Sequence, residues 1–537
     1  MSNVVPINAS ASLYENGAFR GLVQEVLERH LQPQDRYEVA AILESIGWSD
    51  RRAADTFGVQ DVFGLADAIW DSIRDNIQYS SFSKAEELSW RQKLYELLRA
   101  FLRGTIFALP MAISVISMLT LKFSLWSFEN LSVELATSIA IGTILSFMTV
   151  GGFTQAIARR GFFYILQGHY MLASRTTFFF IKVGFVLCLV MAVLILAVDM
   201  LFTLFPYRML FHILAYFILL TGIWITVTVM YILKKELYFT GIIVLGIFLV
   251  YVLYKILGID IIFSQLVALT IVSLLCMLLI MRLFRQAEKK AGPTTVSVMP
   301  RVSITIYSAM HYFFYGFLYF TFIYIDRIVA WSTNNTYMPY VIWFRGEYEV
   351  GMDFALLMLM IPLGISEVNI SWFMRKLEAE QKKYMADEAE KMNRFFLRRY
   401  IRTQLLQVVT AIGSAILVFW LFHYASNNYF LENAQGFLAS EVTQFVLVWA
   451  LVAYAVLSVF LLNAVILFSL SQPTKINKAL IIGLIVNFVV GFLLSRWVDY
   501  HYAIFGLLAG SLVVAVLSTI NLMKLIKKLD YYLYAAS

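Results

Sequence analysis

Long apolar stretches dominate the chain from about residue 100 to residue 527. Each is about 20 residues long, which is the length an α-helix needs to cross the hydrocarbon core of a bilayer. Twelve such stretches predict twelve transmembrane helices, with approximate cores at residues 100–121, 133–157, 176–203, 209–233, 238–257, 261–284, 303–331, 351–374, 404–424, 442–470, 476–497 and 502–526. The pattern therefore predicts an all-α polytopic membrane protein.

The first hundred residues follow another pattern. Between residues 18 and 99 apolar positions recur at helical spacing, Ser49 or Asp50 is placed to cap a short helix, and Gly58 is placed to end it. Residues 1–100 carry 10 Lys and Arg against 15 Asp and Glu, a net charge of −5. An acidic segment is a poor ligand for nucleic acid. We expect a small helical domain that docks a partner.

Basic residues are distributed unevenly among the loops. If residues 1–99 are cytoplasmic, the inner segments from Arg159 onward carry 24 Lys and Arg, whereas the outer segments carry 6. Cytoplasmic loops of membrane proteins are enriched in Lys and Arg. The bias predicts a protein of the bacterial cytoplasmic membrane with both termini inside the cell.

A Gly-Pro pair at residues 292–293 divides the spans into two sets of six, which is typical of a two-lobed transporter. The charged segment 375–403 is the longest connection between spans, and it is either an interfacial helix or a solvated linker helix. The predicted organisation is an acidic domain in residues 1–99, a first six-helix lobe in 100–284, a linker in 285–302, a second lobe in 303–527 and a tail in 528–537.

Several kinds of chemistry have no signal in this sequence. It contains neither a Walker A loop nor a His-Glu-x-x-His motif, and the first hundred residues have no Asp-x-Asp. The six His are scattered, and the two Cys, Cys188 and Cys276, lie in apolar runs. We therefore expect no catalytic residues, no metal site and no cofactor. The pattern favours a transporter over an ATPase, a protease or a glycosyltransferase.

Two groups of polar residues lie inside predicted spans, where ionisable side chains are costly and usually face a cavity or a partner. Asp326 and Arg327 lie near one end of the seventh span, either on a transport path or as an interfacial pair next to Trp331. In the eighth span Glu367 and Asn369 follow a predicted helix break at Pro362 and Gly364. Glu367 is a candidate for substrate or cation binding, or it reaches the interface and pairs with Arg375.

The seventh span is also rich in tyrosine. Tyr312, Tyr315 and Tyr319 fall at spacings of three and four residues, so they share one face of a helix. Tyrosine rings can stack on sugar rings and their hydroxyls can bond to sugar hydroxyls. These residues either line a sugar path or are packed or lipid-facing aromatics.

With these residues in view, the chain resembles the Pel exopolysaccharide transporter family of the multidrug/oligosaccharidyl-lipid/polysaccharide exporter superfamily. The resemblance is most specific between residues 312 and 374, where a Tyr-rich span ends in Asp326 and Arg327 and a later span contains Ile361-Pro362 and Glu367. Residue 327 is Lys in that family. The resemblance covers about residues 100–527 and does not include the acidic domain.

The resemblance implies export of a cell-surface exopolysaccharide, or of its lipid-linked precursor, across the cytoplasmic membrane. It also implies a cytoplasmic glycosyltransferase and further membrane components as partners, besides the lipid bilayer. Transport would be driven either by a cation that binds at Glu367 or Asp326, or by the glycosyltransferase pushing the growing chain. A polymerase-like enzyme of glycan assembly and a non-transporting scaffold or sensor are the alternatives.

The charge bias yields a test of orientation. In whole cells, a cysteine introduced by Asn335→Cys should react with a membrane-impermeant thiol reagent, and one introduced by Met385→Cys should react only after permeabilisation. Labelling of Met385→Cys alone in intact cells would reverse the orientation.

Overall fold

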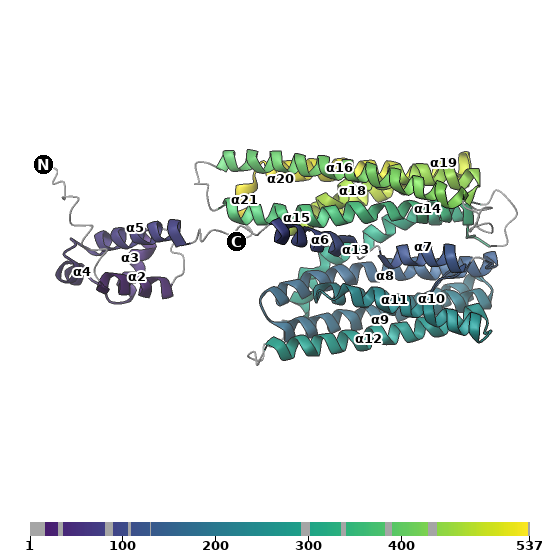
Figure 1. Ribbon diagram of the computed structural model, residues 1–537, viewed down its shortest axis with the longest axis horizontal. Helices are drawn as coiled ribbons and strands as arrows, with labels where there is room; N and C mark the ends of the chain where they lie inside the picture. The colour runs from purple at the N-terminus through teal and green to yellow at the C-terminus, as the bar shows by residue number, and fades with distance from the viewer. Residues whose placement is uncertain are drawn as a thin grey trace. The chain divides into compact units, whose positions relative to one another are not determined.

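The computed structural model describes residues 17–29, 36–80, 90–105, 109–128, 130–291, 301–333, 340–381, 389–427 and 438–534. These residues are almost wholly helical, and a single β-bridge pairs Phe123 with Phe128 (Figure 1). Eleven helices are long and apolar enough to span a membrane, and a bent pair makes up to twelve. The prediction of an all-α polytopic membrane protein is thereby confirmed.

Residues 1–96 and 97–537 form two compact units. The first unit contains α2 (Gly17–Arg29), α3 (Arg36–Ser45), α4 (Asp50–Phe57) and α5 (Val62–Ser80). Its core is built from apolar side chains, among them Phe19, Val39 and Leu65. Ser49 caps α4 by accepting a hydrogen bond from the backbone N–H of Arg52, and Gly58 ends α4 in the left-handed conformation with φ of 68°.

The second unit holds the membrane spans. The first six are formed by α6 (Trp90–Thr105) with α7 (Leu109–Leu121), α8 (Val133–Leu166), α9 (Tyr170–Phe202), α10 (Tyr207–Ile232), α11 (Glu236–Tyr251) extended by the π-turn η1 (Val252–Ile256), and α12 (Ile261–Ala291). The second six are formed by α13 (Val302–Trp331), α14 (Gly346–Leu356) with η2 (Leu357–Leu359) and α15 (Met360–Gln381), α16 (Ala389–Asn427), α18 (Glu441–Ser469), α19 (Pro473–Trp497), and η5 (Tyr500–Ala503) with α20 (Ile504–Ile526). The short helix α21 (Leu529–Tyr534) follows.

The two sets of six repeat one architecture. The fourth span of each set is its central helix, because 67% of the apolar segment of α10 and 61% of that of α18 are buried. The third span of each set is the most exposed one, with 17% buried in α9 and 28% in α16. Each set encloses its own apolar core, one built on α8 to α12 and the other on α13 to α20.

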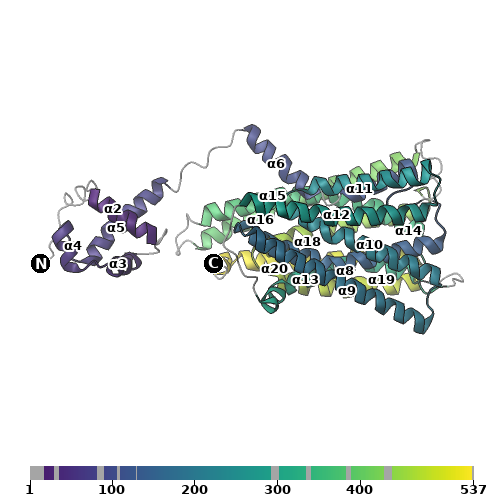
Figure 2. The ribbon, with the colours of Figure 1, turned by 90° about the horizontal axis from the view of Figure 1, so that it is seen from below.

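The two lobes meet where α8 crosses α13, and both views of the ribbon place these helices together (Figures 1 and 2). The crossing is made by glycine. A Cβ atom on Gly316 of α13 would lie 2.0 Å from the carbonyl oxygen of Gly151 in α8, so the backbones approach directly. Small residues permit this close packing of membrane helices. At one end of α8 the lobes are joined by a hydrogen bond of 3.1 Å from the Phe344 N–H to the Thr137 hydroxyl.

Two details differ from the expected spans. The first span is not one straight helix: α6 and α7 are bent by 65° relative to each other. The segment 375–403 does not form a separate interfacial helix, because its described parts continue α15 and α16. Its helix-favouring residues extend both transmembrane helices past their apolar stretches. Residues 382–388 lie outside the described residues.

The glycine crossing predicts a position-specific penalty. Gly316→Ala should lower the free energy of unfolding of the purified protein by about 1–3 kcal/mol, because the added methyl group would collide with the backbone of Gly151, which cannot move aside as a flexible side chain can. Gly413→Ala, in α16, is the matched control, since nothing lies within 4 Å of its added Cβ. It should be neutral or stabilising by up to about 1 kcal/mol. Equal melting temperatures for the two variants would contradict the close contact.

Candidate functional site

A cluster of charged side chains is buried in the second lobe, between α13 and α14. Arg327 is 4% exposed and Asp326 is fully buried. One guanidinium nitrogen of Arg327, Nη1, donates to Glu349 Oε2 and, at 2.8 Å, to Asp353 Oδ1. Glu349 and Asp353 are four residues apart in α14, so one helix face presents both carboxylates to Arg327.

Aromatic side chains complete this cluster. The Trp331 indole Nε1 donates to Glu349 Oε1 at 2.9 Å, and the Tyr348 hydroxyl donates to Asp326 Oδ2 at 2.8 Å. Trp331 is 2% exposed, so its indole is packed inside the protein beside the charged pair and does not form part of an exposed aromatic surface. These side chains are buried because the first turns of α14 pack against this end of α13.

The cluster has more negative than positive groups and has spare polar atoms. Two buried carboxylates, Asp326 and Glu349, and a third, Asp353, whose side chain is 44% exposed, lie around one guanidinium, which gives −2 for the whole cluster and −1 for its buried part when all are ionised. Within the described part of the chain, Asp326 Oδ1 and Arg327 Nε are buried without a hydrogen-bond partner, and the Tyr454 hydroxyl lies next to the guanidinium of Arg327. Buried polar groups are normally satisfied, so these two atoms make the cluster a candidate binding site.

The tyrosine face of α13 points into the second lobe. Tyr315 stacks on Tyr319 with ring centroids 5.9 Å apart, and Tyr312 and Tyr315 both pack against Phe468 of α18. The three tyrosines therefore share one face, as their spacing predicts. Tyr312 and Tyr315 are packed aromatics, with exposures of 7% and 6%, and they do not line an open channel here.

Glu367 lies elsewhere, at a contact between the lobes. Its carboxylate is 3.7 Å from Arg103 of α6. Beside this pair the backbones of Gly104 and Gly364 cross, because a Cβ on Gly104 would lie 2.8 Å from the Gly364 Cα. Asn369 is 8% exposed, and its Nδ2 has no hydrogen-bond partner among the described residues. The structure therefore does not bring Glu367 together with Asp326 and Arg327.

The predicted break at Pro362 takes a mild form. The turn before it is the 3-10 helix η2, and the span continues through Pro362 and Gly364 to Leu377. Proline has no N–H to donate to the carbonyl four residues earlier, Met358. The Ser414 hydroxyl of α16 donates to that carbonyl instead at 2.6 Å, and Gln407 Nε2 donates to the Pro362 carbonyl at 3.2 Å. A neighbouring helix thus satisfies the freed backbone.

Two members of the cluster had no clear signal in the sequence. Asp353 lies in an apolar span and Tyr454 in another, and nothing in their spacing relates them to Arg327. The four-residue interval between Glu349 and Asp353 was the available signal, since it places two carboxylates on one helix face.

Comparison with known proteins identifies the fold. The sequence matches no protein-family model and no curated protein. Among solved structures, the chain is similar to a MOP superfamily transporter from Pyrococcus furiosus (TM-score 0.54, 16% identity, covering 81% of this chain and 98% of that one). It is also similar to the Vibrio cholerae MATE transporter VcmN in its bent form, with a TM-score of 0.54 and 12% identity over 82% of this chain and 99% of that one. A third similar structure is the eukaryotic MATE transporter AtDTX14, with a TM-score of 0.52 and 11% identity over 79% of this chain and 93% of that one. The chain therefore has the fold of MATE and other MOP superfamily transporters.

The buried cluster predicts a strong coupling between Arg327 and Glu349. Arg327→Met leaves carboxylates buried without their counter-ion and should lower stability by about 3–5 kcal/mol. The double variant Arg327→Met/Glu349→Met removes both charges, so it should be more stable than Arg327→Met alone. Melting temperatures of the purified variants measure this difference. Strictly additive losses would show that the two side chains do not interact.

Proposed function

We propose that this protein is an exporter that moves a cell-surface exopolysaccharide, or its lipid-linked precursor, across the cytoplasmic membrane, and that a cation or proton bound at the cluster drives the movement. The transporter fold supports the general activity, and the residues shared with the Pel family support the substrate class. An enzymatic role has no catalytic constellation to support it among the described residues.

The observation that carries the coupling is the buried excess of carboxylates. Asp326 and Glu349 are buried beside one guanidinium, whereas the side chain of Asp353 is 44% exposed, so the buried part of the cluster carries −1 when ionised. A net charge in the interior of a membrane protein is costly unless a cation or a proton neutralises it. Asp326 and Arg327 belong to α13, which is also the helix that meets α8 of the other lobe. A charge change in the cluster therefore acts on the helix that forms the lobe contact, and this is the arrangement that alternating access requires.

Glu367 has a different role in this proposal. Its pair with Arg103 joins α15 of the second lobe to α6 of the first, so the lobes can separate at that end only when the pair is broken. The side chains of Arg103 and Glu367 are 29% and 23% exposed, which leaves the pair within reach of a polar substrate. We assign the pair to the closure of the path at that end, together with the Gly104–Gly364 crossing.

The acidic domain is the proposed docking module for a cytoplasmic glycosyltransferase. Its α3 and α5 expose two aromatic side chains, Tyr37 at 59% and Phe63 at 51%, whose rings are in edge contact at 6.4 Å. Exposed aromatics are typical of a protein-binding surface. Beside them Asp67 pairs with Arg36 at 3.6 Å, so the aromatic face fits an apolar patch on the partner, and the net charge of −5 of residues 1–100 favours a basic partner.

The coupling proposal predicts the effect of removing one charge. Glu349→Gln keeps the shape of the side chain but removes its charge, so export should fall by at least about tenfold while the amount of protein in the membrane stays normal. Polymer released by the host is the readout, and Glu441→Gln, at an exposed position at the start of α18, is the matched control. Normal export by Glu349→Gln would overturn cation coupling at this site.

Two further substitutions separate the roles of the residues. Arg327→Lys should export normally, because Nη1 alone makes both carboxylate contacts and a lysine ammonium can take its place.

Glu367→Gln should lower export and leave its dependence on a cation gradient intact, since Glu367 lies outside the cluster. Loss of gradient dependence in Glu367→Gln, measured in proteoliposomes, would place coupling at Glu367 instead.

A further inference from the structure

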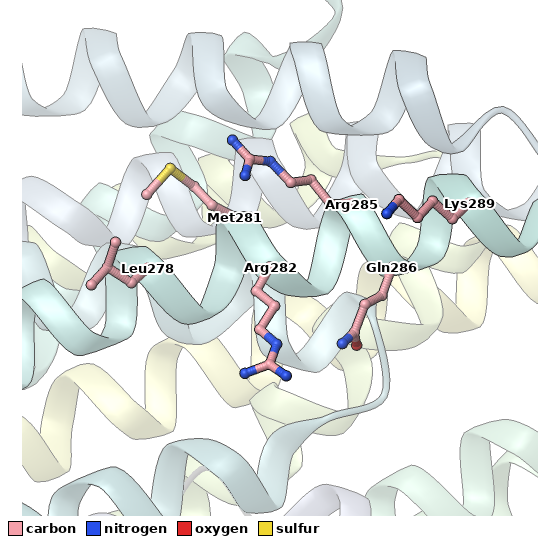
Figure 3. A pocket seen from close by; sticks show the side chains of 6 residues that line it. All are labelled: Leu278, Met281, Arg282, Arg285, Gln286 and Lys289. Carbon is pink, nitrogen blue, oxygen red and sulfur yellow. The ribbon is translucent and has the colours of Figure 1, made fainter.

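An open groove runs along the C-terminal turns of α12, outside the charge cluster and away from the lobe contact. Its volume is about 520 Å³, and it is lined by Leu278, Met281, Arg282, Arg285, Gln286 and Lys289 (Figure 3). The membrane-spanning segment of α12 ends at Lys289, so the groove lies where the span leaves the apolar core of the membrane.

The side chains form two rows along the helix. Met281, Arg285 and Lys289 are spaced four residues apart, and so are Leu278, Arg282 and Gln286, so each set follows one ridge of the helix. Figure 3 shows Arg285 and Arg282 pointing to opposite sides of the helix. Each row begins with an apolar residue, continues with an arginine and ends with a further polar residue. The groove therefore changes from apolar to basic along its length.

The three cations are available to a ligand. Arg282, Arg285 and Lys289 are exposed, and within the described ranges none of them forms an ion pair. The one acidic residue of α12, Glu288, is half-buried and is not among the lining residues. The groove thus presents a charge of +3 with no internal counter-ion.

We propose that this groove binds the head group of an anionic glycerophospholipid. On one row the planar guanidinium group of Arg285 matches the geometry of phosphate oxygens and Lys289 adds a second charge, while Arg282 adds a third charge from the other row. Leu278, which is 59% exposed, and Met281 continue the groove into the apolar zone, where an acyl chain packs against them. A free phosphate would use only the basic half, so the apolar half favours a lipid.

The test is lipid retention by the full-length protein. The protein is extracted from nanodiscs containing equal amounts of phosphatidylglycerol and phosphatidylcholine, and bound lipids are counted by native mass spectrometry. Each Lys or Arg at an anionic membrane surface strengthens binding by about fivefold, so Arg282→Gln/Arg285→Gln/Lys289→Gln should weaken phosphatidylglycerol retention by about a hundredfold. Phosphatidylcholine retention should not change, and Arg282→Lys/Arg285→Lys should keep most of the binding because it keeps the charge.

The matched control is Arg394→Gln/Arg398→Gln/Arg402→Gln, which removes three exposed arginines from α16. An equal loss of phosphatidylglycerol in this control would overturn the proposal, since the effect would then be general electrostatics. Displacement of the bound lipid by inorganic phosphate at equal concentration would also overturn it, in favour of a free-phosphate site. The same spectra report oligomer mass, and a change from dimer to monomer in the α12 variant would instead make the groove a contact between two copies.

Discussion

The guanidinium group of Arg327 lies inside an apolar helical bundle between two buried carboxylates, Asp326 and Glu349, and a partly exposed one, Asp353. The electrostatic attraction between the guanidinium and the carboxylates is strong there because little water screens it. For the same reason each unpaired charge is costly. The first turns of α14 are held against α13 by these contacts and by the bonds from Trp331 and Tyr348. The packing of the second lobe is carried mainly by α18, α19 and α20, and the position of the cluster on α13 connects it to the helix that meets the first lobe.

The fold was predictable to the extent that it depends on length and polarity. Twelve apolar stretches gave the number of spans because the bilayer thickness sets the length of a helix. Caps at Ser49 and Gly58 were also readable, since local backbone chemistry alone determines them. The repeat of two six-helix lobes left no visible sequence similarity, yet it is evident in burial, because α10 and α18 occupy equivalent central positions.

The candidate site was predictable only in part. Asp326 and Arg327 could be singled out because charges inside a span are rare, but their partners depend on how α14 packs against α13. That packing is set by contacts between residues more than 20 positions apart, such as Arg327 with Glu349 and Asp353. The interruption near Pro362 could be expected from the sequence, but the Ser414 hydroxyl that satisfies the freed carbonyl could not, because it belongs to another helix.

The glycine crossing between α8 and α13 affects how related sequences can be compared. Where two side chains touch, a larger one on one helix can be balanced by a smaller one on the other, and the two positions covary during evolution. At Gly316 the neighbour is the backbone of Gly151, so there is nothing to exchange, whereas a side chain on Gly151 would meet the ring of Phe320. Residue 316 would therefore leave almost no coevolutionary trace, and the contact between the lobes would be detected through position 151 and Phe320.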